Sequence, residues 1–435
     1  MTDPSRRSFL KSSALASATL AVGQAAAQED KAEAVKNAAH AGGSDVIRVG
    51  LIGCGGRGRG AGVQTLRADP GTKIVALADA FAEPMGTFLK VAGAIEDVKD
   101  RIEVGEENQY TGLDCHTKLL ENEDVDLVIL ASPPGFRPSH YMASVAAGKH
   151  VFTEKPVAVD GPGLRLTQDA NQMAKDKGLS VVSGLCWRYE QAMVDVIDQL
   201  RDGLAGKLMA AESIRYSGLV GRREPREASQ TDFEHAVRNW FFRTWLSGDF
   251  CVEQFVHDLD MVCWALGEYP SSVICAGGRE TREDDGNIFD HFAANFVFDS
   301  GVKYAASTRH QAGCENRYHN HVVGTAGVCD LMRYKITGHG GTTLYRGKGA
   351  KTPMHQAEHH FMYEALRKGE PLHNGDYMVD STATGIMMRE AAYTGKSVTR
   401  EQVMTSQERL FPETYAWDSP VPTQPVATPG VTTLG

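Results

Sequence analysis

The stretch RVGLIGCGGRGRGAG, residues 48–62, decides the fold of this chain. It starts with a short apolar run that ends in glycine, which is typical of a buried β-strand. Gly53, Gly55 and Gly58 then follow in the pattern Gly-x-Gly-x-x-Gly, and a helical pattern runs over Arg57–Arg67. The glycine pattern alone is weak evidence, but between a strand and a helix it indicates a dinucleotide-binding turn.

Each glycine of this turn has a physical task. Gly53 allows the tight turn, Gly55 lets the backbone approach a pyrophosphate, and Gly58 lets the helix pack closely on the strand. The first N–H groups of the helix would then point at the phosphates. We therefore assign Gly53, Gly55, Gly56, Arg57 and Gly58 to cofactor binding, with a glycine-rich turn that holds no ligand as the alternative.

Asp79 ends the next apolar run, KIVALADA, 21 residues after Gly58. A carboxylate at this position accepts a hydrogen bond from a ribose 2′-hydroxyl and repels a 2′-phosphate. The sequence therefore predicts NAD as the cofactor. Arg57 and Arg59 could reach a phosphate, so NADP stays open as an alternative.

Strand-like and helix-like segments alternate from Val46 onward. Helical patterns cover 82–94, 115–122, 137–147 and 161–177, and further strand-like runs are VDLVILAS, KHVFTEK and LSVVSG. This alternation is typical of βαβ units with a parallel sheet. The expected fold class is α/β, with an N-terminal Rossmann domain of doubly wound parallel strands over residues 46–160.

The second half of the chain follows a different pattern. Strand-like runs succeed one another, several of them alternate polar and apolar residues, and helical patterns appear at 251–266 and 355–368. We predict an α+β domain over 161–405 with a large, mostly antiparallel and open-faced sheet. The proline-rich residues 406–435 are expected to form an extended tail.

The N-terminus has the features of an export signal. Arg6 and Arg7 lie in SRRSFLK, a weakly apolar stretch covers 12–23, and small residues at 25–27 suit a cleavage site. The motif resembles bacterial twin-arginine signals, which direct folded proteins to the periplasm. We predict a signal peptide over 1–27 and a linker over 28–45, with an uncut anchor as the alternative, although the apolar part is too short for a membrane-spanning helix.

Charge and cysteine content exclude several classes of protein. The formal net charge is −10, and it becomes −12 without residues 1–27 because that segment carries Arg6, Arg7 and Lys11 against Asp3. This charge argues against nucleic acid or an anionic membrane as a partner. The eight cysteines contain no Cys-x-x-Cys pair, so we expect no zinc ribbon. They lie within apolar runs, so we expect mostly buried thiols. Folding in a reducing cytoplasm before export would also limit disulfides.

A lysine follows one of the buried strands. HVFTEKPVAVD places Glu154 and Lys155 at the carboxyl end of that strand, where open α/β sheets bind their ligands. A lysine in this place can donate to a substrate oxygen and stabilise an alkoxide. A nearby cationic nicotinamide would lower the lysine pKa and so help it act as an acid or proton relay. A surface lysine at a turn is the alternative.

These motifs together resemble the glucose–fructose oxidoreductase and inositol dehydrogenase family (Gfo/Idh/MocA). The resemblance covers about 46–399 and includes SPPGFRPSHYMASVAAGKHVFTEKP, VVGTAGV and the closing run from EHHFMYEALRKGEPL to TGKSVT. It implies a nicotinamide cofactor, with Ser132, Pro133, Glu154 and Lys155 among its contacts. It also implies an open-faced sheet that forms homodimers or homotetramers.

The run GDFCVEQFVHDLDMVCWALG, residues 248–267, places Glu253 and His257 four residues apart on a predicted helix. The resemblance implies that His257 is the general base, that Glu253 orients it, and that Asp260 supports the substrate pocket. The departure is Glu253, where related dehydrogenases often have Asp. Histidine suits a base because its ordinary pKa lies near neutral pH.

Other roles for these residues stay open. His257 could be purely structural, or Glu253 and His257 could bind a metal together with His310, His319 or His321. We expect no metal, because the spacing is not that of a His-Glu-x-x-His motif. Arg188 and Tyr189 follow the strand VVSGLCW and are candidate pocket residues, the alternative being a packed aromatic beside a surface arginine.

The sequence therefore predicts an NAD(P)-dependent oxidoreductase that acts on a CH–OH group of a sugar or polyol. An exported enzyme has no free NAD pool, so we expect a tightly held cofactor that is restored within each cycle. The alternative is an NAD-dependent glycosidase or lyase that oxidises the sugar transiently, because GCGGRG resembles the loop of such enzymes. A non-catalytic sugar-binding protein is a third hypothesis.

Overall fold

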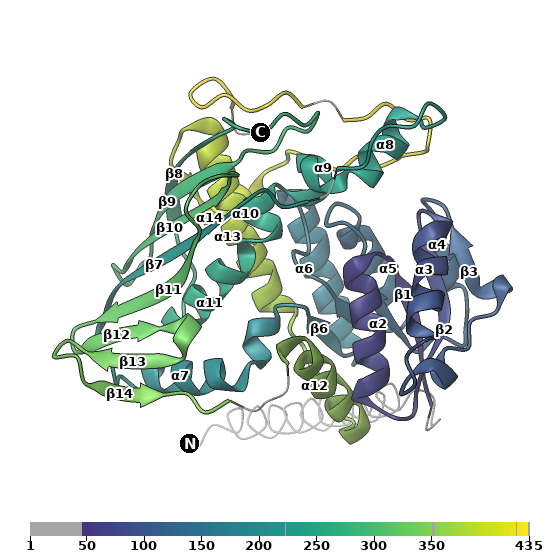
Figure 1. Ribbon diagram of the computed structural model, residues 1–435, viewed down its shortest axis with the longest axis horizontal. Helices are drawn as coiled ribbons and strands as arrows, with labels where there is room; N and C mark the ends of the chain where they lie inside the picture. Colours follow the sequence, from purple (N-terminus) through teal and green to yellow (C-terminus); the bar gives the residue numbers. More distant parts are fainter. Residues whose placement is uncertain (1–45, 222, 350–352, 423, 434–435) are drawn as a thin grey trace, which may run out of the picture.

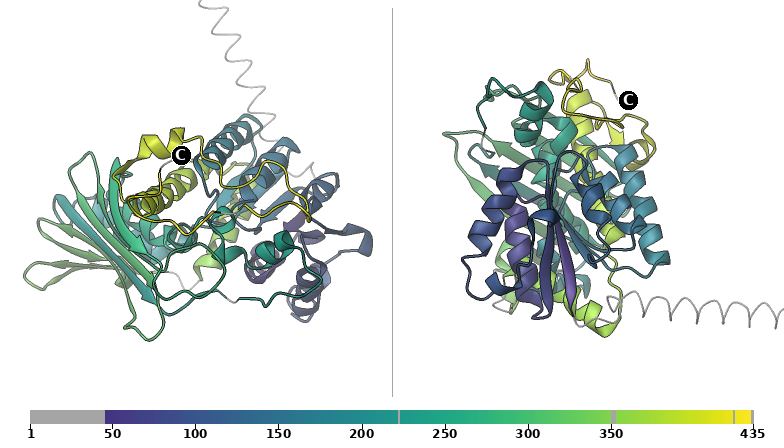
Figure 2. Two further views of the ribbon diagram at one scale, coloured as in Figure 1. Left: turned by 90° about the horizontal axis from the view of Figure 1, so that it is seen from above. Right: turned by 90° about the vertical axis from the view of Figure 1, so that its right-hand side faces the viewer.

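The computed structural model describes residues 46–221, 223–349, 353–422 and 424–433 (Figure 1). The proposed signal peptide and linker lie outside these residues. Two sheets organise the described chain: a parallel sheet with helices on both faces, and a larger sheet with helices on one face (Figures 1 and 2). This arrangement confirms the predicted α/β fold class with its second, mostly antiparallel sheet.

The first sheet has six parallel strands in the order β3-β2-β1-β4-β5-β6. The strand order reverses between β1 and β4, and ligands of such sheets bind in the crevice at that reversal. The strands are β1 (Ile47–Ile52), β2 (Thr72–Asp79), β3 (Gln109–Thr111), β4 (Leu127–Leu130), β5 (His150–Thr153) and β6 (Val181–Ser183).

Five helices connect these strands, and each lies within two residues of its predicted bounds. They are α2 (Gly56–Ala68), α3 (Ala82–Ala92), α4 (Cys115–Leu120), α5 (Arg137–Ala146) and α6 (Gly161–Asp176). The apolar residues of the strands are almost completely buried between the two helix layers, as expected for a parallel sheet.

The second sheet has nine strands in the order β14-β13-β12-β11-β7-β10-β9-β8-β15. Neighbours are antiparallel except β7 and β10, which run parallel. The strands are β7 (Leu208–Ser217), β8 (Ser272–Gly278), β9 (His291–Val297), β10 (Lys303–His310), β11 (Arg317–Gly324), β12 (Gly327–Asp330), β13 (Lys335–Gly338), β14 (Thr343–Arg346) and β15 (Val398–Thr399).

Helices cover one face of this sheet and join it to the first domain. α7 (Gln191–Arg201), α11 (Val256–Leu266) and α13 (Gly375–Thr394) pack on the inner face, while α12 (Met354–Lys368) lies against α2 (Figure 1). α13 has no polar stripe and is buried on nearly every side. Shorter helices are α8 (Asp232–Arg238), α9 (Thr244–Ser247), α10 (Phe250–Glu253) and α14 (Arg400–Thr405).

The single helix predicted over 251–266 is wrong. The chain forms α10, interrupts the helix at Gln254 and Phe255, and continues as α11. The N–H of Phe255 bonds to the carbonyl of Phe250, five residues back, at 3.1 Å. This wider turn removes the regular one-turn relation between Glu253 and His257, with consequences for the site.

The C-terminal residues 406–422 and 424–433 contain no helix or strand (Figure 1). The first part contacts the first domain, and the last part returns to the second domain, where the N–H of Gly430 bonds to the carbonyl of Thr394 at 2.9 Å. Asp160, the N-cap of α6, accepts the backbone N–H groups of Leu410 and Phe411 at 2.8 and 3.3 Å. Phe411 packs edge-on against Phe136 at 4.8 Å between ring centroids. The first part of the tail is therefore held to the Rossmann domain by both hydrogen bonds and aromatic packing.

The eight cysteines all lie in the described part of the chain. They are unpaired, and all but Cys314 are buried. Among the described helices, none combines the length and the apolar character needed to cross a membrane.

Candidate functional site

The glycine turn has the geometry that a dinucleotide requires. Gly53 has φ +90°, and a Cβ there would lie 2.5 Å from the backbone nitrogen of Ser132. A Cβ on Gly58 would lie 1.8 Å from the carbonyl oxygen of Gly53. At Gly55 and Gly56, by contrast, a Cβ would meet nothing within 4 Å. The turn is thus closed on the protein side and open where a pyrophosphate would sit beside the first N–H groups of α2.

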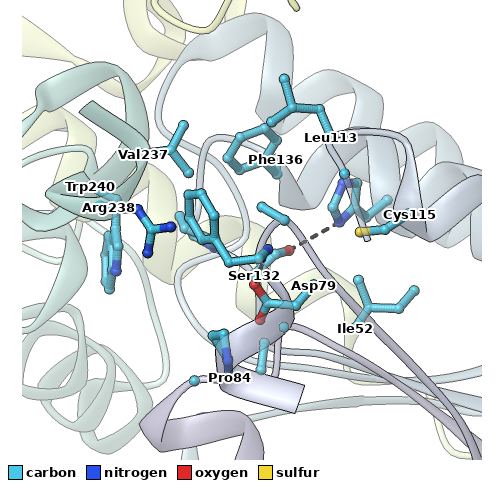
Figure 3. A pocket seen from close by; sticks show the side chains of 18 of the residues that line it. Ile52, Asp79, Pro84, Leu113, Cys115, Ser132, Phe136, Val237, Arg238 and Trp240 are labelled. Carbon is cyan, nitrogen blue, oxygen red and sulfur yellow. Dashed lines mark hydrogen bonds between the residues drawn. The ribbon is translucent and has the colours of Figure 1, made fainter. Parts of the chain in front are cut away.

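A cavity of about 260 Å³ lies beside this turn (Figure 3). One wall comes from the first domain and the facing wall from the α8 segment of the second domain. The residues of the first wall include Ile52, Gly53, Gly55, Asp79, Phe81, Ser132 and Pro133, and those of the second include Glu224, Val237, Arg238 and Trp240. The structure therefore brings six of the ten predicted cofactor residues together on or next to one cavity: Gly53, Gly55, Gly56, Asp79, Ser132 and Pro133.

Asp79 lies in the cavity wall at the end of β2. Its carboxylate oxygens accept the backbone N–H of Cys54 at 2.7 Å and of Phe81 at 3.0 Å. Burial raises the pKa of this carboxyl group, while the two N–H donors act in the opposite direction. The carboxylate is thereby fixed in place where a ribose hydroxyl group is expected.

The Arg57 side chain is bound by three polar side chains of the protein. Its guanidinium donates to Glu154, to Glu358 at 3.1 Å and to Gln64 at 3.0 Å. Burial lowers the Arg57 pKa, but the two carboxylates outweigh it and raise the pKa above its ordinary value. We call Arg57, Glu154 and Glu358 the arginine cluster. Arg57 and Glu154, both predicted cofactor residues, bind each other here.

The pKa values of the two carboxyl groups in the arginine cluster shift in opposite directions. Glu154 is buried, but Arg57 holds its pKa below the ordinary value. Burial, together with the charge of Glu154, raises the pKa of Glu358 well above its ordinary value. Arg57 thus favours the ionised form of Glu154, and Glu358 on α12 ties the second domain to the helix that follows the glycine turn.

Lys155 directly follows Glu154, and its ammonium group binds α10. It donates to the backbone carbonyl of Glu253 and to the Glu253 carboxylate at 3.0 Å. The side chains of Lys155 and Glu253 are 14% and 13% exposed, so both reach solvent-accessible space. The lysine at the end of β5 is thus fixed by a residue of the second domain.

His257 lies on α11 close to the same ammonium group. Burial is the main cause that lowers its pKa well below the ordinary value, and the charges of Lys155 and Arg215 add to this effect. Its Nδ1 atom is buried without a hydrogen-bond partner among the described residues. His257 is therefore neutral at physiological pH and carries an unused nitrogen. We call Lys155, Glu253 and His257 the lysine cluster.

The expectation that Glu253 orients His257 is wrong for this structure. The Glu253 carboxylate binds Lys155, and no hydrogen bond between Glu253 and His257 occurs in the described chain. The cause is the interruption after α10, because four residues no longer equal one helical turn there. Glu253 positions the lysine instead of the histidine.

Arg188, Tyr189 and Asp260 lie further from the glycine turn. Arg188 binds the 1% exposed carboxylate of Asp260 with three contacts of 2.8–3.1 Å, and Ser381 donates to Asp260 at 2.6 Å. Tyr189 donates its hydroxyl proton to Asn374. The substrate contacts expected of these residues stay a prediction, and this geometry favours a structural role for Arg188 and Asp260.

A second cavity, also about 260 Å³, adjoins the lysine cluster. Glu253 and Gln254 line it, and Arg238 and Trp240 line both this cavity and the first one. The other residues of its wall are Val220, Gly221, Asn239, Phe241 and Phe242. A small molecule in this space would contact aromatic rings on one side and Glu253 on the other.

Several charged residues around His257 were not predicted from the sequence. Arg215 on β7 binds Asp258 at 3.2 Å, and His355 on α12 lies near Glu358 at 3.4 Å. Both influence the pKa of His257. One sequence feature could have revealed Arg215: it is a charged residue in phase with Ala211 and Ser213, which are buried on the inner face of β7.

The histidines considered for a catalytic metal do not gather around Glu253 and His257. His310 is buried and stacks on Phe250 at 4.0 Å, and burial lowers its pKa to about 3. His319 and His321 alternate with Asn320, which bonds to Asp258 on α11 and so faces inward. The two histidines therefore lie on the outer face of the sheet.

Comparison with known proteins agrees with this architecture. Residues 47–185 match the model of an oxidoreductase family with an NAD-binding Rossmann fold, and residues 208–330 match the model of the Gfo/Idh/MocA C-terminal domain. A glycosyl hydrolase family 109 protein of Bacteroides fragilis is 39% identical over 116 residues, which is 26% of this chain and 23% of that protein. The inositol 2-dehydrogenase of Acidothermus cellulolyticus is 24% identical over 247 residues, 56% of this chain and 60% of that protein.

Solved structures share the fold at low sequence identity. An aldose–aldose oxidoreductase from Caulobacter crescentus, complexed with glycerol, superposes with a TM-score of 0.63 at 18% identity, covering 81% of this chain and 99% of the other. A levoglucosan dehydrogenase in complex with NADH and levoglucosan gives 0.62 at 18% identity, with the same coverage. These likenesses establish the fold of the two domains.

The open glycine turn, the fixed Asp79 and the matched first domain define an NAD-binding protein of the oxidoreductase class. The two family models belong together and match more than half of the chain. The chain is a member of the Gfo/Idh/MocA family.

Proposed function

We propose that this protein oxidises a CH–OH group of a sugar or polyol and keeps its NAD bound throughout the cycle. The proposal rests on the lysine cluster: an ammonium group at the end of β5, fixed by Glu253, beside a neutral histidine with an unused nitrogen. Bound NAD would supply the acceptor for the hydride that leaves the substrate carbon.

Each residue of the lysine cluster has its own role in the oxidation of the substrate hydroxyl group. Lys155 donates a hydrogen bond to the substrate oxygen and stabilises the negative charge that develops there. His257, neutral because its pKa is depressed, accepts the hydroxyl proton. Glu253 holds the ammonium group in place through its carboxylate and its backbone carbonyl.

The second cavity is the proposed substrate site. A sugar or polyol has an apolar face of C–H groups and a rim of hydroxyl groups. Trp240 offers an aromatic surface on which the C–H face can pack. Glu253 and Asn239 offer groups that can form hydrogen bonds with the hydroxyl groups. The names of the similar proteins, which include inositol and levoglucosan dehydrogenases, favour the same class of substrate.

NAD is favoured over NADP by two charged residues. The carboxylate of Asp79 would repel a 2′-phosphate. Arg57 could otherwise attract a 2′-phosphate and offset this repulsion, but its guanidinium donates to Glu154, Glu358 and Gln64. Comparing the affinity for NAD and NADP tests this choice, and equal affinities would contradict it.

Contacts across the cofactor cavity support retention of the nucleotide. The guanidinium of Arg238 lies 3.8 Å from the ring centroid of Phe81 and binds Glu83 at 3.2 Å. Trp417 of the tail packs on the same Phe81 ring at 5.4 Å. These contacts join the α8 segment and the tail to the first domain beside the cavity, and we expect them to slow the release of a bound nucleotide.

Retention connects to the proposed export. A protein that leaves the cytoplasm folded, through the twin-arginine motif at Arg6 and Arg7, would have to take its NAD along. Fractionation of cells tests this: the wild type should reach the periplasm, whereas Arg6→Lys with Arg7→Lys should stay in the cytoplasm. Equal distribution of both forms would refute the export proposal.

We also propose a homodimer or homotetramer that forms through the outer face of the nine-stranded sheet. Ile274 on β8 and Val297 on β9 are apolar residues of this face that are 57% and 36% exposed, and exposed apolar side chains are candidates for contacts between subunits. Light scattering of Ile274→Glu against wild type tests this contact. The proposal requires the variant to shift toward the monomer.

One experiment tests the main proposal. The protein is purified, denatured, and its released nucleotide counted, and native protein is then screened against sugars and polyols while nicotinamide absorbance is followed. About one NAD(H) per chain and a substrate-dependent absorbance change support the proposal. Protein that carries nucleotide but changes with no sugar or polyol would refute the substrate class, and protein without nucleotide would refute retention.

The alternative is a glycosidase or lyase in which oxidation of a ring hydroxyl acidifies a neighbouring C–H, permits elimination, and ends with return of the hydride. The similarity to glycosyl hydrolase family 109 proteins favours this reading. Aryl glycosides distinguish the two. Release of the aryl group without accumulation of NADH would establish the alternative.

A further inference from the structure

The outer face of the nine-stranded sheet carries a cluster of histidine and carboxylate groups. Glu212 on β7 pairs with His321 on β11, and His321 pairs with Asp330 on β12, so that the three residues form a row across three neighbouring strands. His319 lies two residues before His321 and therefore on the same face. Sheet geometry thus places all four side chains together.

The distances within this cluster suit a metal ion. One ligand atom each of Glu212, His319 and His321 lies within 4.8 Å of the other two. His319 Nε2 is 3.0 Å from the Glu212 carboxylate, and the two imidazole rings stack at 4.5 Å between centroids. A small movement of the Glu212 side chain, which is 52% exposed, would bring the three ligand atoms around one ion.

Asp330 supports the cluster from the side. Its carboxylate lies 3.5 Å from His321 Nε2, an arrangement by which carboxylates orient histidines that bind metals. Arg333 approaches the same carboxylate at 3.6 Å, so Asp330 is shared and the ion would keep three protein ligands. The two histidines are only 18% and 32% exposed, which restricts their motion before any ion binds.

We propose that Glu212, His319 and His321 bind a divalent transition-metal ion of the Zn²⁺ type. Two imidazoles and one carboxylate are a ligand set that zinc accepts, with water in the fourth position. The site is separate from the lysine cluster, because the inner face of the same strands carries Arg215 and Asn320 toward α11. Its expected effect is structural, since it joins β7 to β11.

Zinc titration of the untagged full chain tests the site, with a chromophoric chelator as competitor. We expect one Zn²⁺ per chain, and at least a tenfold weaker affinity in His319→Ala with His321→Ala and in Glu212→Gln. Co²⁺ in place of zinc should give visible absorption bands that these variants lose. His291→Ala is the matched control, because His291 is a partly exposed histidine beside the Asp290 carboxylate, at 2.8 Å, in the same sheet.

Two results would overturn the proposal: no uptake of zinc at micromolar concentration, or equal uptake by the double-histidine variant. Circular dichroism of each variant checks that the fold is kept. A zinc-dependent rise of Tm in wild type and in His291→Ala, absent from the double variant, supports the site without any use of activity.

Discussion

Glu154 and Lys155 are consecutive residues, yet their side chains enter two very different clusters of charge. In the arginine cluster, Glu154 is 3% exposed and Glu358 is 0% exposed, and the guanidinium of Arg57 donates to both and to Gln64. In the lysine cluster, both partners of the ion pair are partly exposed, and the adjacent His257 has a nitrogen without a partner. Each cluster has one buried atom without a partner among the described residues, Glu358 Oε2 and His257 Nδ1, but only the lysine cluster adjoins the second cavity, through Glu253.

This difference between the two clusters indicates that the charges of the arginine cluster serve the structure, whereas those of the lysine cluster can take part in the reaction. Buried ion pairs hold elements in place, and the pair of Arg57 with Glu358 joins α2 to α12 in this way. Incompletely satisfied groups next to a cavity are available to a substrate. Two adjacent residues at the end of β5 can therefore serve stability and chemistry separately, and variants of the two clusters should differ in what they change.

The largest expected effect is on catalysis. Lys155→Met should lower kcat by about 10³-fold, because it removes the donor that stabilises the developing alkoxide. Single-turnover change of nicotinamide absorbance with the substrate found in the screen measures this effect. Lys175→Met is the matched control, since Lys175 forms a comparable ion pair with Asp376 at 2.8 Å on the surface. Retention of more than about a tenth of the wild-type rate would remove Lys155 from the mechanism.

The second-largest expected effect is that of a substitution in the arginine cluster on the stability of the folded protein. Arg57→Gln leaves Glu154 buried without its cation and should lower the free energy of unfolding by about 2–3 kcal/mol, less than for a fully buried pair because Arg57 is partly exposed. Urea unfolding measures the change. Arg67→Gln on the same helix breaks only the exposed pair with Asp97 and should leave stability nearly unchanged. Equal stability of the two variants would refute the structural role of the arginine cluster.

The two clusters also differ in how far the sequence predicts them. The glycine turn, Asp79 and the position of Lys155 follow from local rules: a strand, the φ that Gly53 needs, and the end of a parallel strand. The partner of Lys155 depends on where a helix is interrupted. Asp249, a non-glycine residue with φ 75°, caps α10, and nothing in the apolar periodicity reveals the interruption that follows.

Contacts between residues that lie far apart in the chain are a second feature that the sequence does not predict. Glu358 reaches Arg57 across 301 residues of chain, and the inward position of Arg215 becomes clear only when the sheet is known. Only folding brings these charges near His257. The sequence therefore identifies which residues carry chemistry more readily than it identifies which residues tune them.

The pH dependence of the reaction tests whether Lys155 acts on His257 within the lysine cluster. Burial, followed by the charge of Lys155, depresses the His257 pKa, so the histidine stays neutral and able to accept a proton below its ordinary titration range. We expect kcat/KM to stay level as pH falls through about 6.5, the ordinary value, and to decline only in more acidic solution. NMR titration of His257 should show a higher pKa in Lys155→Met than in wild type. An unchanged pKa would mean that the ammonium group does not act on this histidine.

The smallest of the expected effects is on the rate of nucleotide release, and it follows from a substitution in the C-terminal tail, outside both clusters. Trp417 packs on Phe81 beside the cofactor cavity, so Trp417→Ala should speed the release of bound nucleotide several-fold while the rate of hydride transfer stays the same. Release into excess competing nucleotide, followed by fluorescence, measures this rate. Phe361→Ala serves as the control, because Phe361 is a 48% exposed aromatic residue on α12 that does not line the cavity. If both variants release nucleotide at the wild-type rate, the tail does not retain it, and closure of the cavity depends on contacts such as that of Arg238 with Phe81.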